Sequence, residues 1–282
     1  MIFRKRLVHW RSLVRILDFW TRIGTKNQNQ RDPQGHKALA SAMAVAAAGG
    51  ELRLLGTWSS PWVIRVRVAL GLKGLSYEYL EEDLASKSDL LLRSNPVHGK
   101  VPVLLHGGRP VCESLVILEY ADEAWPGVGP PLLPSDPYDR ATARFWAAYV
   151  NDTFLPAFRA LFRSLTEEQR AAAFENAVPK VEALDRALAE CSKGKPFFGG
   201  DAVGLVDVAL GSHLVWIRAV DEVAGTNLLD GARFPGLAAW AERFLAVDAV
   251  REVVPDAGKV LEQYKGFRAK WIAAAGSTSK ST

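Results

Sequence analysis

The sequence predicts a small α/β domain followed by a larger all-helical domain, and three features of its 282 residues support this fold class. Two short apolar runs, 52–56 and 77–81, flank a helical pattern over 61–73, which is typical of a βα unit followed by a returning strand. A stretch with five prolines, 126–138, indicates a linker. After Asp136 only helical periods recur, so the second half of the chain is expected to hold no sheet.

The other elements follow from local signals in the same way. Residues 83–95 form a short helical pattern that ends before Pro96, and an amphipathic helix is expected over 113–125. Between them, apolar residues alternate around Gly107-Gly108, which indicates a β-hairpin. The helical half shows amphipathic patterns over 138–165, 167–191, 206–225, 234–247 and 251–271. Pro179 is expected to break the second of these patterns.

The turn before the first helix carries a serine, a proline and then apolar residues at helical spacing. Ser60 is expected to be the N-cap and Pro61 the first residue of the helix, because proline is favoured at that position. Arg65 and Arg67 fall off the apolar stripe. The sequence therefore predicts a hydroxyl group at the N-terminus of a helix.

The net charge of +4 is unevenly distributed along the chain. Residues 1–50 carry a net charge of +7 and the remaining 232 residues a net charge of −3, which argues against a nucleic-acid-binding body. The two cysteines are 79 positions apart, so no disulfide framework is expected. This low cysteine content suits a protein of a reducing compartment. The five histidines form no HxxxH or HExxH pair, so no metal site is expected.

Residues 1–50 are compositionally separate from the rest of the chain. They mix Arg with Leu, Ile, Val and Trp at roughly helical spacing, which is typical of an organelle-targeting peptide or of a helix lying on a membrane surface. Because serine is scarce there, we favour an extension that has no role in the fold. No apolar run approaches the roughly 18–20 residues that a transmembrane helix needs.

Four segments of the chain, in this order, resemble a glutathione transferase of the plant tau class: LLGTWSSPWVIRVRVALGLKGLSYEYLEEDL, NPVHGKVPVLLHGGRPVCESLVILEYADEAW, LLPSDPYDRATARFWAAYV and FFGGDAVGLVDVAL. The resemblance spans about Leu52 to Trp271. It implies that the α/β domain is thioredoxin-like and binds glutathione, and that the helical domain binds a hydrophobic electrophile. The expected divisions of the chain are an extension, the thioredoxin-like domain, a linker, the helical domain and a flexible tail, over 1–50, 51–126, 127–136, 137–271 and 272–282.

The resemblance also implies a biochemical and cellular setting. Glutathione serves as the co-substrate, so no cofactor is needed, and members of this class are typically cytosolic homodimers. Many act on herbicides, other xenobiotics and lipid peroxidation products, in detoxification and stress response, and a glutathione peroxidase side activity is part of the expectation.

By the resemblance, Ser60 is the catalytic residue, and its chemistry suits that role. The reaction is the attack of the glutathione thiolate on an electrophilic carbon. A free thiol has a pKa near ~8.5, so forming mostly thiolate at pH 7 needs stabilisation by roughly 2 kcal/mol. A hydroxyl donor and a helix N-terminus each supply part of it. The hydroxyl of Ser60 can cap the helix and donate to sulfur at once, although a cap without a further role also fits the pattern.

The resemblance assigns the rest of the glutathione site. The backbone of Val101, before a cis Pro102, is expected to pair with the peptide-like middle of glutathione. Lys87 and Lys100 are expected to hold its glycine carboxylate. Taken alone, these residues also fit an ordinary edge strand and solvated lysines.

The γ-glutamyl end of glutathione carries an ammonium and a carboxylate close together. The resemblance implies that Glu113 pairs with the ammonium and that Ser114, at a helix N-terminus, binds the carboxylate. Without the resemblance, Ser114 would be read as a plain N-cap.

The helical domain is expected to supply the electrophile pocket and one structural cap. Aromatic residues at helical spacing also fit a core. Asp207 in the motif GLVD matches the family's capping box, of which only half survives because Gly204 stands where Ser or Thr is usual. Replacing Asp207 by Ala is expected to lower stability by about 0.5–2 kcal/mol. The expected pocket residues are Phe154, Phe158, Arg159 and Trp216.

Two other functions compete with conjugation. A thiol–disulfide exchange enzyme or a dehydroascorbate reductase needs a cysteine where Ser60 stands, and Cys112 and Cys191 lie in other elements. A non-catalytic carrier of hydrophobic ligands would have nearly the same sequence. Turnover with glutathione and an electrophile distinguishes a conjugating enzyme from such a carrier.

Overall fold

The computed structural model describes residues 52–278, with side chains described as far as residue 275. These residues fall within one compact unit, Gly49–Thr282. The predicted basic extension, residues 1–50, lies outside the described residues.

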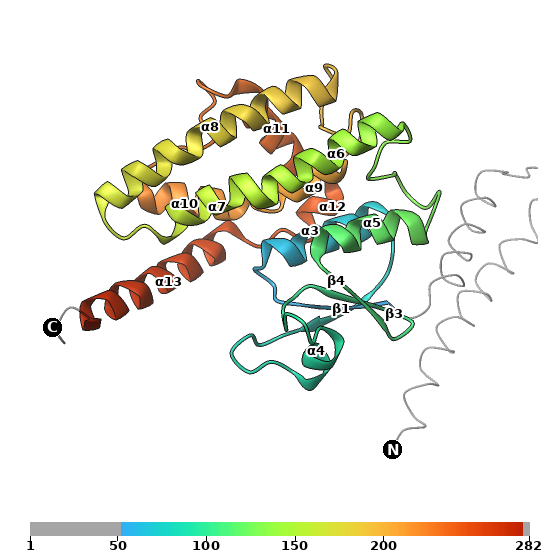
Figure 1. Cartoon of the computed structure of the whole chain (residues 1–282), viewed down its shortest axis with the longest axis horizontal. Coiled ribbons are helices and arrows are strands. Elements are labelled where there is room, and N and C mark those ends of the chain that lie inside the picture. Colours follow the sequence, from blue (N-terminus) through green and yellow to red (C-terminus); the bar gives the residue numbers. More distant parts are fainter. Residues whose placement is uncertain (1–51, 279–282) are drawn as a thin grey trace, which may run out of the picture. The chain divides into compact units, whose positions relative to one another are not determined.

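The first part of the chain forms a four-stranded mixed sheet with three helices (Figure 1). The strands lie in the order β2-β1-β3-β4; β1 and β2 are parallel, and the other pairs are antiparallel. Helices α3 and α5 lie on one side of the sheet and α4 on the other. The elements are β1 (Leu52–Gly56), α3 (Pro61–Leu72), β2 (Glu78–Glu81), α4 (Asp89–Ser94), β3 (Val103–His106), β4 (Arg109–Cys112) and α5 (Ser114–Ala124).

The local signals in the sequence account for these elements. Ser60 caps α3 and Pro61 is its first residue, as predicted. Gly107 and Gly108 both have positive φ angles, 56° and 79°, which a two-residue turn between antiparallel strands requires and which favour glycine. Leu91 of α4 is fully buried in one cluster with Val103 and Leu105 of the sheet, and the half-buried Leu90 packs against the same cluster, so these two leucines hold α4 on the sheet.

The second part of the chain is entirely helical in the described residues. Its first long pattern forms a nearly continuous rod in which a π-helical segment joins α6 to α7. The long helix α8 packs against α7, and α13 packs against α10 (Figure 1). The elements are α6 (Pro137–Tyr149), the π-helix η1 (Val150–Phe154), α7 (Leu155–Arg163), α8 (Glu167–Ser192), α9 (Leu205–Gly211), α10 (Leu214–Ala224), α11 (Pro235–Ala246), α12 (Asp248–Arg251) and α13 (Ala257–Thr278).

Two details of this part differ from the prediction. Pro179 does not break its helix, because it lies on the exposed face of α8, where water can solvate the backbone carbonyl that loses its partner, while the neighbouring Val178 and Val181 are buried. The tail predicted from residue 272 is helical as far as Thr278, since α13 continues through the alanine run 273–275, and alanine has the highest helix propensity.

The two parts of the fold share a core along α3. Buried residues occur on all faces of this helix between Val63 and Leu70, because the sheet and α5 cover one face while α9 and α12 pack on others. Val63, Val66, Val68 and Leu70 are fully buried. The architecture confirms the predicted class, a thioredoxin-like α/β domain followed by an all-helical domain, and it places the N-terminus of α3 where the two domains meet.

Candidate functional site

All seven residues predicted to bind or activate glutathione line one cavity of about 750 Å³. They come from the N-terminus of α3, the loop after β2, the loop before β3 and the N-terminus of α5. We call this space the polar cavity. The seven residues are Ser60, Lys87, Lys100, Val101, Pro102, Glu113 and Ser114.

Ser60 is the N-cap residue of α3, and its side chain caps the helix. The Oγ accepts a hydrogen bond from the backbone N–H of Val63 at 3.4 Å. This bond uses one acceptor site only, and no acceptor for the hydroxyl proton lies among the described residues. Ser60 can therefore donate to a thiolate in the polar cavity while it caps the helix.

The loop before β3 is held by a buried amide. Asn95 accepts a hydrogen bond from the backbone N–H of His98 at 3.2 Å and donates from Nδ2 to the carbonyl oxygen of Lys100 at 3.0 Å. The peptide bond between Val101 and Pro102 is cis. Val101 lies two residues before the start of β3 at Val103, is half-buried and lines the polar cavity.

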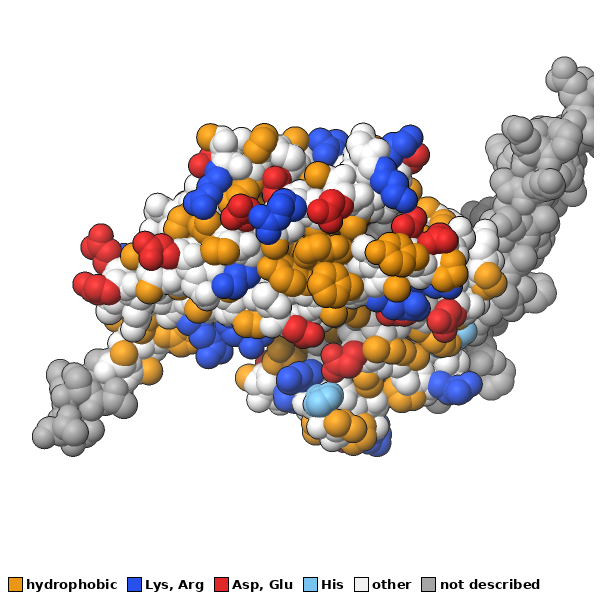
Figure 2. All heavy atoms as spheres, turned by 45° about the horizontal axis from the view of Figure 1, so that its top comes forward, with side chains coloured by type: hydrophobic (Ala, Val, Ile, Leu, Met, Phe, Trp, Pro, Cys, Tyr) orange, Lys and Arg blue, Asp and Glu red, His pale blue; other side chains and the backbone are white. Residues whose placement is uncertain are grey.

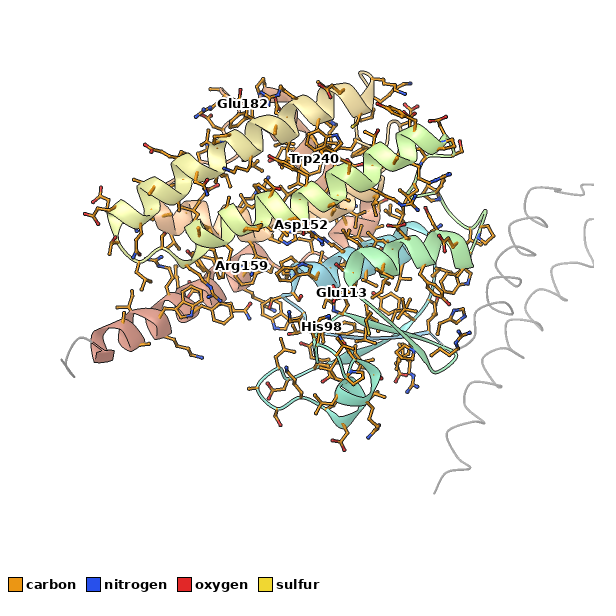
Figure 3. The ribbon with its side chains drawn as sticks, viewed as in Figure 1. His98, Glu113, Asp152, Arg159, Glu182 and Trp240 are labelled. Atoms are coloured by element: carbon orange, nitrogen blue, oxygen red, sulfur yellow. The ribbon has the colours of Figure 1, made fainter. Side chains whose placement is uncertain are left out.

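Glu113, at the N-terminus of α5, has a strained backbone. Among the described residues that line the polar cavity, it is the one non-glycine residue with a positive φ angle. Glu113 has φ 71° and ψ 120°, a conformation that costs roughly 1–3 kcal/mol and is concentrated at functional sites. Its carboxylate lies 3.9 Å from Nε2 of His98. Figure 3 shows Glu113 between His98 and the helical side that bears Asp152 and Arg159. Ser114 follows as the first residue of α5 and is buried.

Lys87 and Lys100 enter the polar cavity from two different loops. Neither forms an ion pair with a described residue. A Cβ atom added to Gly99, which precedes Lys100, would lie 3.7 Å from Nζ of Lys87, so the two lysines border the same corner of the cavity. Two neighbouring ammonium groups without a carboxylate partner can bind the carboxylate of a ligand.

Beneath the polar cavity lies a buried arginine that the sequence pattern did not identify. Arg65 is fully buried; its Nε and Nη2 donate to the carbonyl oxygen of Ala209 at 3.0 and 2.7 Å, and its Nη1 donates to Oδ1 of Asn151 at 2.8 Å and to Oγ of Ser114 at 3.3 Å. Burial lowers the pKa of Arg65 to about 9, so it stays charged at pH 7. No carboxylate in the described chain pairs with it.

The position of Arg65 has a consequence for ligand binding. Its uncompensated positive charge lies directly behind Ser114, whose hydroxyl and helix N-terminus face the polar cavity. A ligand carboxylate at Ser114 would therefore meet a favourable potential. The π-helical turn η1 supplies Asn151 to this contact, and such turns are frequent at functional sites.

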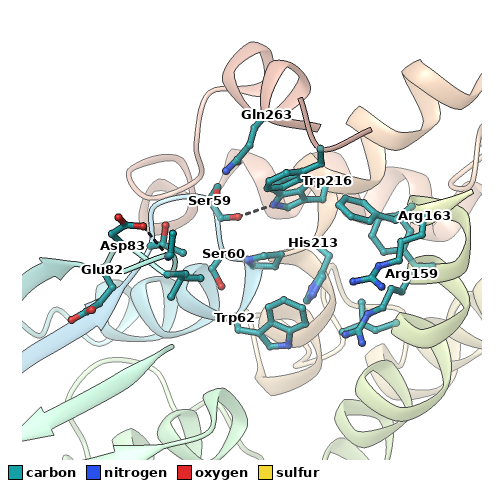
Figure 4. A pocket seen from close by; sticks show the side chains of 18 residues that line it. Ser59, Ser60, Trp62, Glu82, Asp83, Arg159, Arg163, His213, Trp216 and Gln263 are labelled. Atoms are coloured by element: carbon teal, nitrogen blue, oxygen red, sulfur yellow. Dashed lines mark hydrogen bonds between the residues drawn. The ribbon is translucent and has the colours of Figure 1, made fainter. Parts of the chain in front are cut away.

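A second cavity, of about 630 Å³, opens on the other side of Ser60 and is walled by aromatic side chains (Figure 4). We call it the aromatic cavity. Of the predicted electrophile-pocket residues, Phe158, Arg159 and Trp216 line it. The prediction for Phe154 is corrected: this ring does not line the cavity, because it is fully buried and stacks behind Phe158, with 6.2 Å between ring centroids.

The two cavities share a wall at which glutathione sulfur and an acceptor could meet. The residues that line both are Ser60, Trp62, Leu84, Leu155 and Arg159. Trp216 also fixes this junction, because its Nε1 donates to the carbonyl oxygen of Ser59 at 2.7 Å.

Several residues of the aromatic cavity carry no sequence signal that predicts their place there. His213 is one of them: it is buried, its ring stands edge-on to Trp62 with 5.5 Å between centroids, and its Nδ1 lies 3.1 Å from Oγ of Ser212. Burial lowers the pKa of His213 well below its usual value, and the charges of Arg65 and Arg159 act in the same direction. No local motif distinguishes His213 from a core residue; only packing reveals it. The other missed residues include Phe162, Arg163, Gln263 and Phe267.

Asp207 lies away from both cavities and acts in folding. It accepts from the backbone N–H of Gly204 at 2.9 Å, which is the surviving half of the predicted capping box. It also accepts from the N–H groups of Phe198 and Gly199 at 2.9 Å and from Nε1 of Trp240 at 2.7 Å. The single predicted bond is therefore one of four.

The described residues contain no helix that is long and apolar enough to cross a membrane. They also contain no group of three or more His, Cys, Asp or Glu that could hold a metal ion.

Comparison with known proteins identifies the family. The models of the glutathione S-transferase N-terminal and C-terminal domains match residues 50–123 and 167–243. A probable glutathione S-transferase of rice, GSTU6, is 60% identical over 80% of this chain and 98% of its own length. Glutathione S-transferase U17 of Arabidopsis thaliana is 47% identical, over 76% of this chain and 95% of its own.

Solved structures agree with these relatives. The tau-class glutathione S-transferase of mango is 47% identical, with a TM-score of 0.73 over 76% of this chain and 97% of its own. The rice enzyme OsGSTU1, solved in complex with glutathione, is 44% identical, with a TM-score of 0.72 over 78% of this chain and 97% of its own. The chain therefore belongs to the tau class of the glutathione S-transferases.

Proposed function

We propose that the chain conjugates the thiolate of glutathione to hydrophobic electrophiles, with Ser60 as the catalytic residue. One observation carries the proposal: Ser60 lies at the N-terminus of α3 and lines both the polar cavity and the aromatic cavity. The polar cavity offers partners for each charged end of glutathione, and the aromatic cavity suits an apolar acceptor.

The reaction follows from this arrangement. Ser114 holds the γ-glutamyl carboxylate, and the charge of Arg65 behind it favours this position. Glu113 pairs with the ammonium, the Val101 backbone with the central peptide, and Lys87 with Lys100 holds the glycine carboxylate. The sulfur then reaches Ser60, whose hydroxyl and helix N-terminus lower the pKa of the thiol. The thiolate attacks the electrophilic carbon, a carbon–sulfur bond forms, and the leaving group departs with the electron pair of its broken bond.

The polar cavity favours this enzyme over a redox function. Neither Cys112 nor Cys191 lines it, and burial raises the pKa of both thiols, with the carboxylate of Glu113 adding to the effect on Cys112. We therefore assign conjugation as the main activity, on xenobiotics and lipid peroxidation products in the cytosol. A glutathione peroxidase side activity would use the same thiolate.

A direct assay tests the conjugation proposal. The full chain is mixed with glutathione and 1-chloro-2,4-dinitrobenzene, and formation of the thioether is followed by absorbance. Turnover above the uncatalysed rate supports the proposal. Binding of glutathione and of a hydrophobic dye without turnover would make the protein a carrier and overturn it.

We also propose that the chain forms a homodimer. Tyr138 and Phe145 of α6 are 79% and 60% exposed, and Val116 of α5 is exposed as well. The ion pair between Arg144 and Glu119, at 2.7 Å, shows that α6 and α5 lie side by side. Figure 2 shows hydrophobic side chains gathered across the middle of one face, bordered by charged ones.

Such apolar surface is typical of an interface. Light scattering after gel filtration gives the molar mass, and replacing Phe145 with Glu is expected to shift it from dimer toward monomer. A monomeric mass for the unmodified chain would contradict the proposal.

A further inference from the structure

The aromatic cavity has one positively charged wall. Arg159 and Arg163 of α7 both line it. They are one helical turn apart, about 6 Å along the axis, so one small anion can reach both guanidinium groups. Neither forms a hydrogen bond or ion pair with another described residue, while Arg163 lies 5.9 Å from the ring of Trp271.

The negative charges of the cavity lie on the opposite wall and are already engaged. The carboxylate of Glu82 accepts from the N–H and the hydroxyl of Ser88, at 3.2 and 2.7 Å, and Asp83 accepts from the N–H of Ala85 at 2.9 Å. Figure 4 shows both acids on the far side of Ser60 from the two arginines. The cavity is therefore polarised, with free positive charge at one end only.

A buried polar atom without a partner stands beside the arginines. Nε2 of His213 is buried, has no hydrogen-bond partner, and belongs to a residue that lines the cavity. Burying such an atom unpaired is unfavourable by about 1–3 kcal/mol, so it calls for a ligand group. Arg159 is close enough to act on the charge of His213, so an anion at Arg159 lies near this ring. Oγ of Ser212 lies 3.1 Å from Nδ1 of His213 and 3.4 Å from the carbonyl oxygen of Ala209, which already accepts two hydrogen bonds from Arg65. With the hydroxyl proton on the shorter contact, the ring proton of His213 lies on Nε2, which can donate to that anion.

The geometry points to a defined class of acceptor: an apolar electrophile that bears a carboxylate, held by Arg159 and Arg163 with a further hydrogen bond from His213. Its apolar body would pack against Phe162 and Trp216, and its reactive carbon would lie toward Ser60. This inference rests on the proposed conjugation and adds the substrate class.

A matched pair of aryl chlorides tests the inference. The probes are 4-chloro-3,5-dinitrobenzoate and its methyl ester, which have the same reactive carbon and differ in charge. In each reaction the thiolate forms a carbon–sulfur bond at the carbon bearing chlorine, and chloride leaves with the electron pair of the broken bond. For each probe, kcat/KM is divided by the uncatalysed rate constant with glutathione, which removes the difference in intrinsic reactivity.

The wild-type chain is expected to accelerate the carboxylate reaction more than the ester reaction. R159Q and R163Q are each expected to lower the carboxylate-to-ester ratio by about tenfold or more, since a hydrogen bond between charged groups contributes at least that factor. H213F is expected to lower the ratio roughly threefold. R186Q is the control, because Arg186 lies on α8, pairs with Glu182 and lines neither cavity, so its ratio should equal the wild-type value.

Two outcomes would overturn the inference. One is a wild-type preference for the ester; the other is an unchanged ratio in both R159Q and R163Q. If 1-chloro-2,4-dinitrobenzene is turned over while neither benzoate probe is, the acceptor class is wrong and the conjugation proposal stands. If no aryl chloride reacts, the conjugation proposal itself fails.

Discussion

The indole of Trp216 donates a hydrogen bond to the backbone carbonyl oxygen of Ser59 at 2.7 Å. Trp216 belongs to α10 of the helical domain, and Ser59 immediately precedes the residue that caps α3. Both groups are buried. The bond therefore fixes the turn that carries Ser60 against the helical domain, and it couples the position of the hydroxyl group to the wall of the aromatic cavity.

Replacing Trp216 with Phe is expected to lower kcat for conjugation severalfold with a smaller effect on the KM for glutathione. Phe keeps an aromatic ring against Phe267 but leaves the Ser59 carbonyl without its donor, so the turn loosens. Steady-state kinetics measure the effect. Trp271→Phe is the matched control, because Trp271 also packs on Phe267 and lines neither cavity. Equal kinetics for the two variants would contradict a positioning role.

Replacing Asp207 with Ala is expected to lower the free energy of unfolding by more than about 3 kcal/mol, because four donors lose their buried acceptor and each unpaired donor is unfavourable by ~1–3 kcal/mol. This exceeds the 0.5–2 kcal/mol expected for a single cap. Denaturant unfolding at one protein concentration measures it. The protein that remains folded should bind glutathione normally; a fully stable variant that fails to bind would place Asp207 in the site.

His213 is expected to make the protein less stable in mild acid. Its pKa is lowered in the folded state, so the unfolded chain takes up a proton first as the pH falls below about 6.5, and stability is lost from there down to the folded pKa. Between pH 7.5 and 5.5 this loss is at most roughly 1.4 kcal/mol, the value reached when folded His213 stays neutral throughout the interval. His213→Phe removes the titrating group, so its free energy of unfolding should fall less over that interval. Parallel pH dependences for the two proteins would refute the assignment.

The parts of the site that could be predicted are those set by local sequence. Ser60 followed by Pro61 specifies a capped helix start, and Gly107-Gly108 specifies a hairpin turn, because each rests on neighbouring residues alone. Arg65 could not be placed in this way. Periodicity put it off the apolar stripe, yet α9 covers that face of α3 and accepts its hydrogen bonds, a contact between residues 144 positions apart.

The predictions for Phe154 and Pro179 are wrong for related reasons. A helical wheel directs Phe154 and Phe158 to one face, and their rings do stack, but Phe154 is fully buried and only Phe158 lines the aromatic cavity. Pro179 breaks a helix by itself, but buried neighbours on both sides hold α8 together. In both cases tertiary packing outweighs the local preference.

Removing residues 1–50 is expected to leave glutathione binding and thermal stability unchanged. The curated relatives named above are matched over 95–98% of their own length by 76–80% of this chain, so about a fifth of it has no counterpart in them. A truncated chain beginning at Glu51 retains every residue of both cavities. Thermal melts and glutathione titration compare the two chains. A soluble truncated chain that has lost either property would make the extension part of the fold.

Replacing Ser60 with Ala is expected to raise the pKa of the thiol of bound glutathione and to lower the rate of conjugation at pH 7 about tenfold or more. The lost hydrogen bond to a charged sulfur is worth ~1.5–3 kcal/mol, and one pKa unit corresponds to about 1.4 kcal/mol. Binding should persist, because Val101, Glu113 and Ser114 still line the polar cavity. Part of the rate should return at high pH, where the thiolate forms without help. Ser60→Cys should instead favour mixed disulfides with glutathione, since a thiol at a helix N-terminus is activated.

The titration of the bound thiol decides between catalysis and capping alone. Thiolate absorbance is measured against pH for the wild type, Ser60→Ala and Ser88→Ala. Ser88 is the matched control, because its Oγ caps α4 by accepting from Leu91 N–H at 3.0 Å and it lines neither cavity. Ser60→Ala should lose roughly 1 kcal/mol of stability with its cap, and Ser88→Ala more, because it also removes the hydroxyl that donates to Glu82 at 2.7 Å. Only Ser60→Ala should shift the titration, and a curve that coincides with the wild type would remove Ser60 from the chemistry.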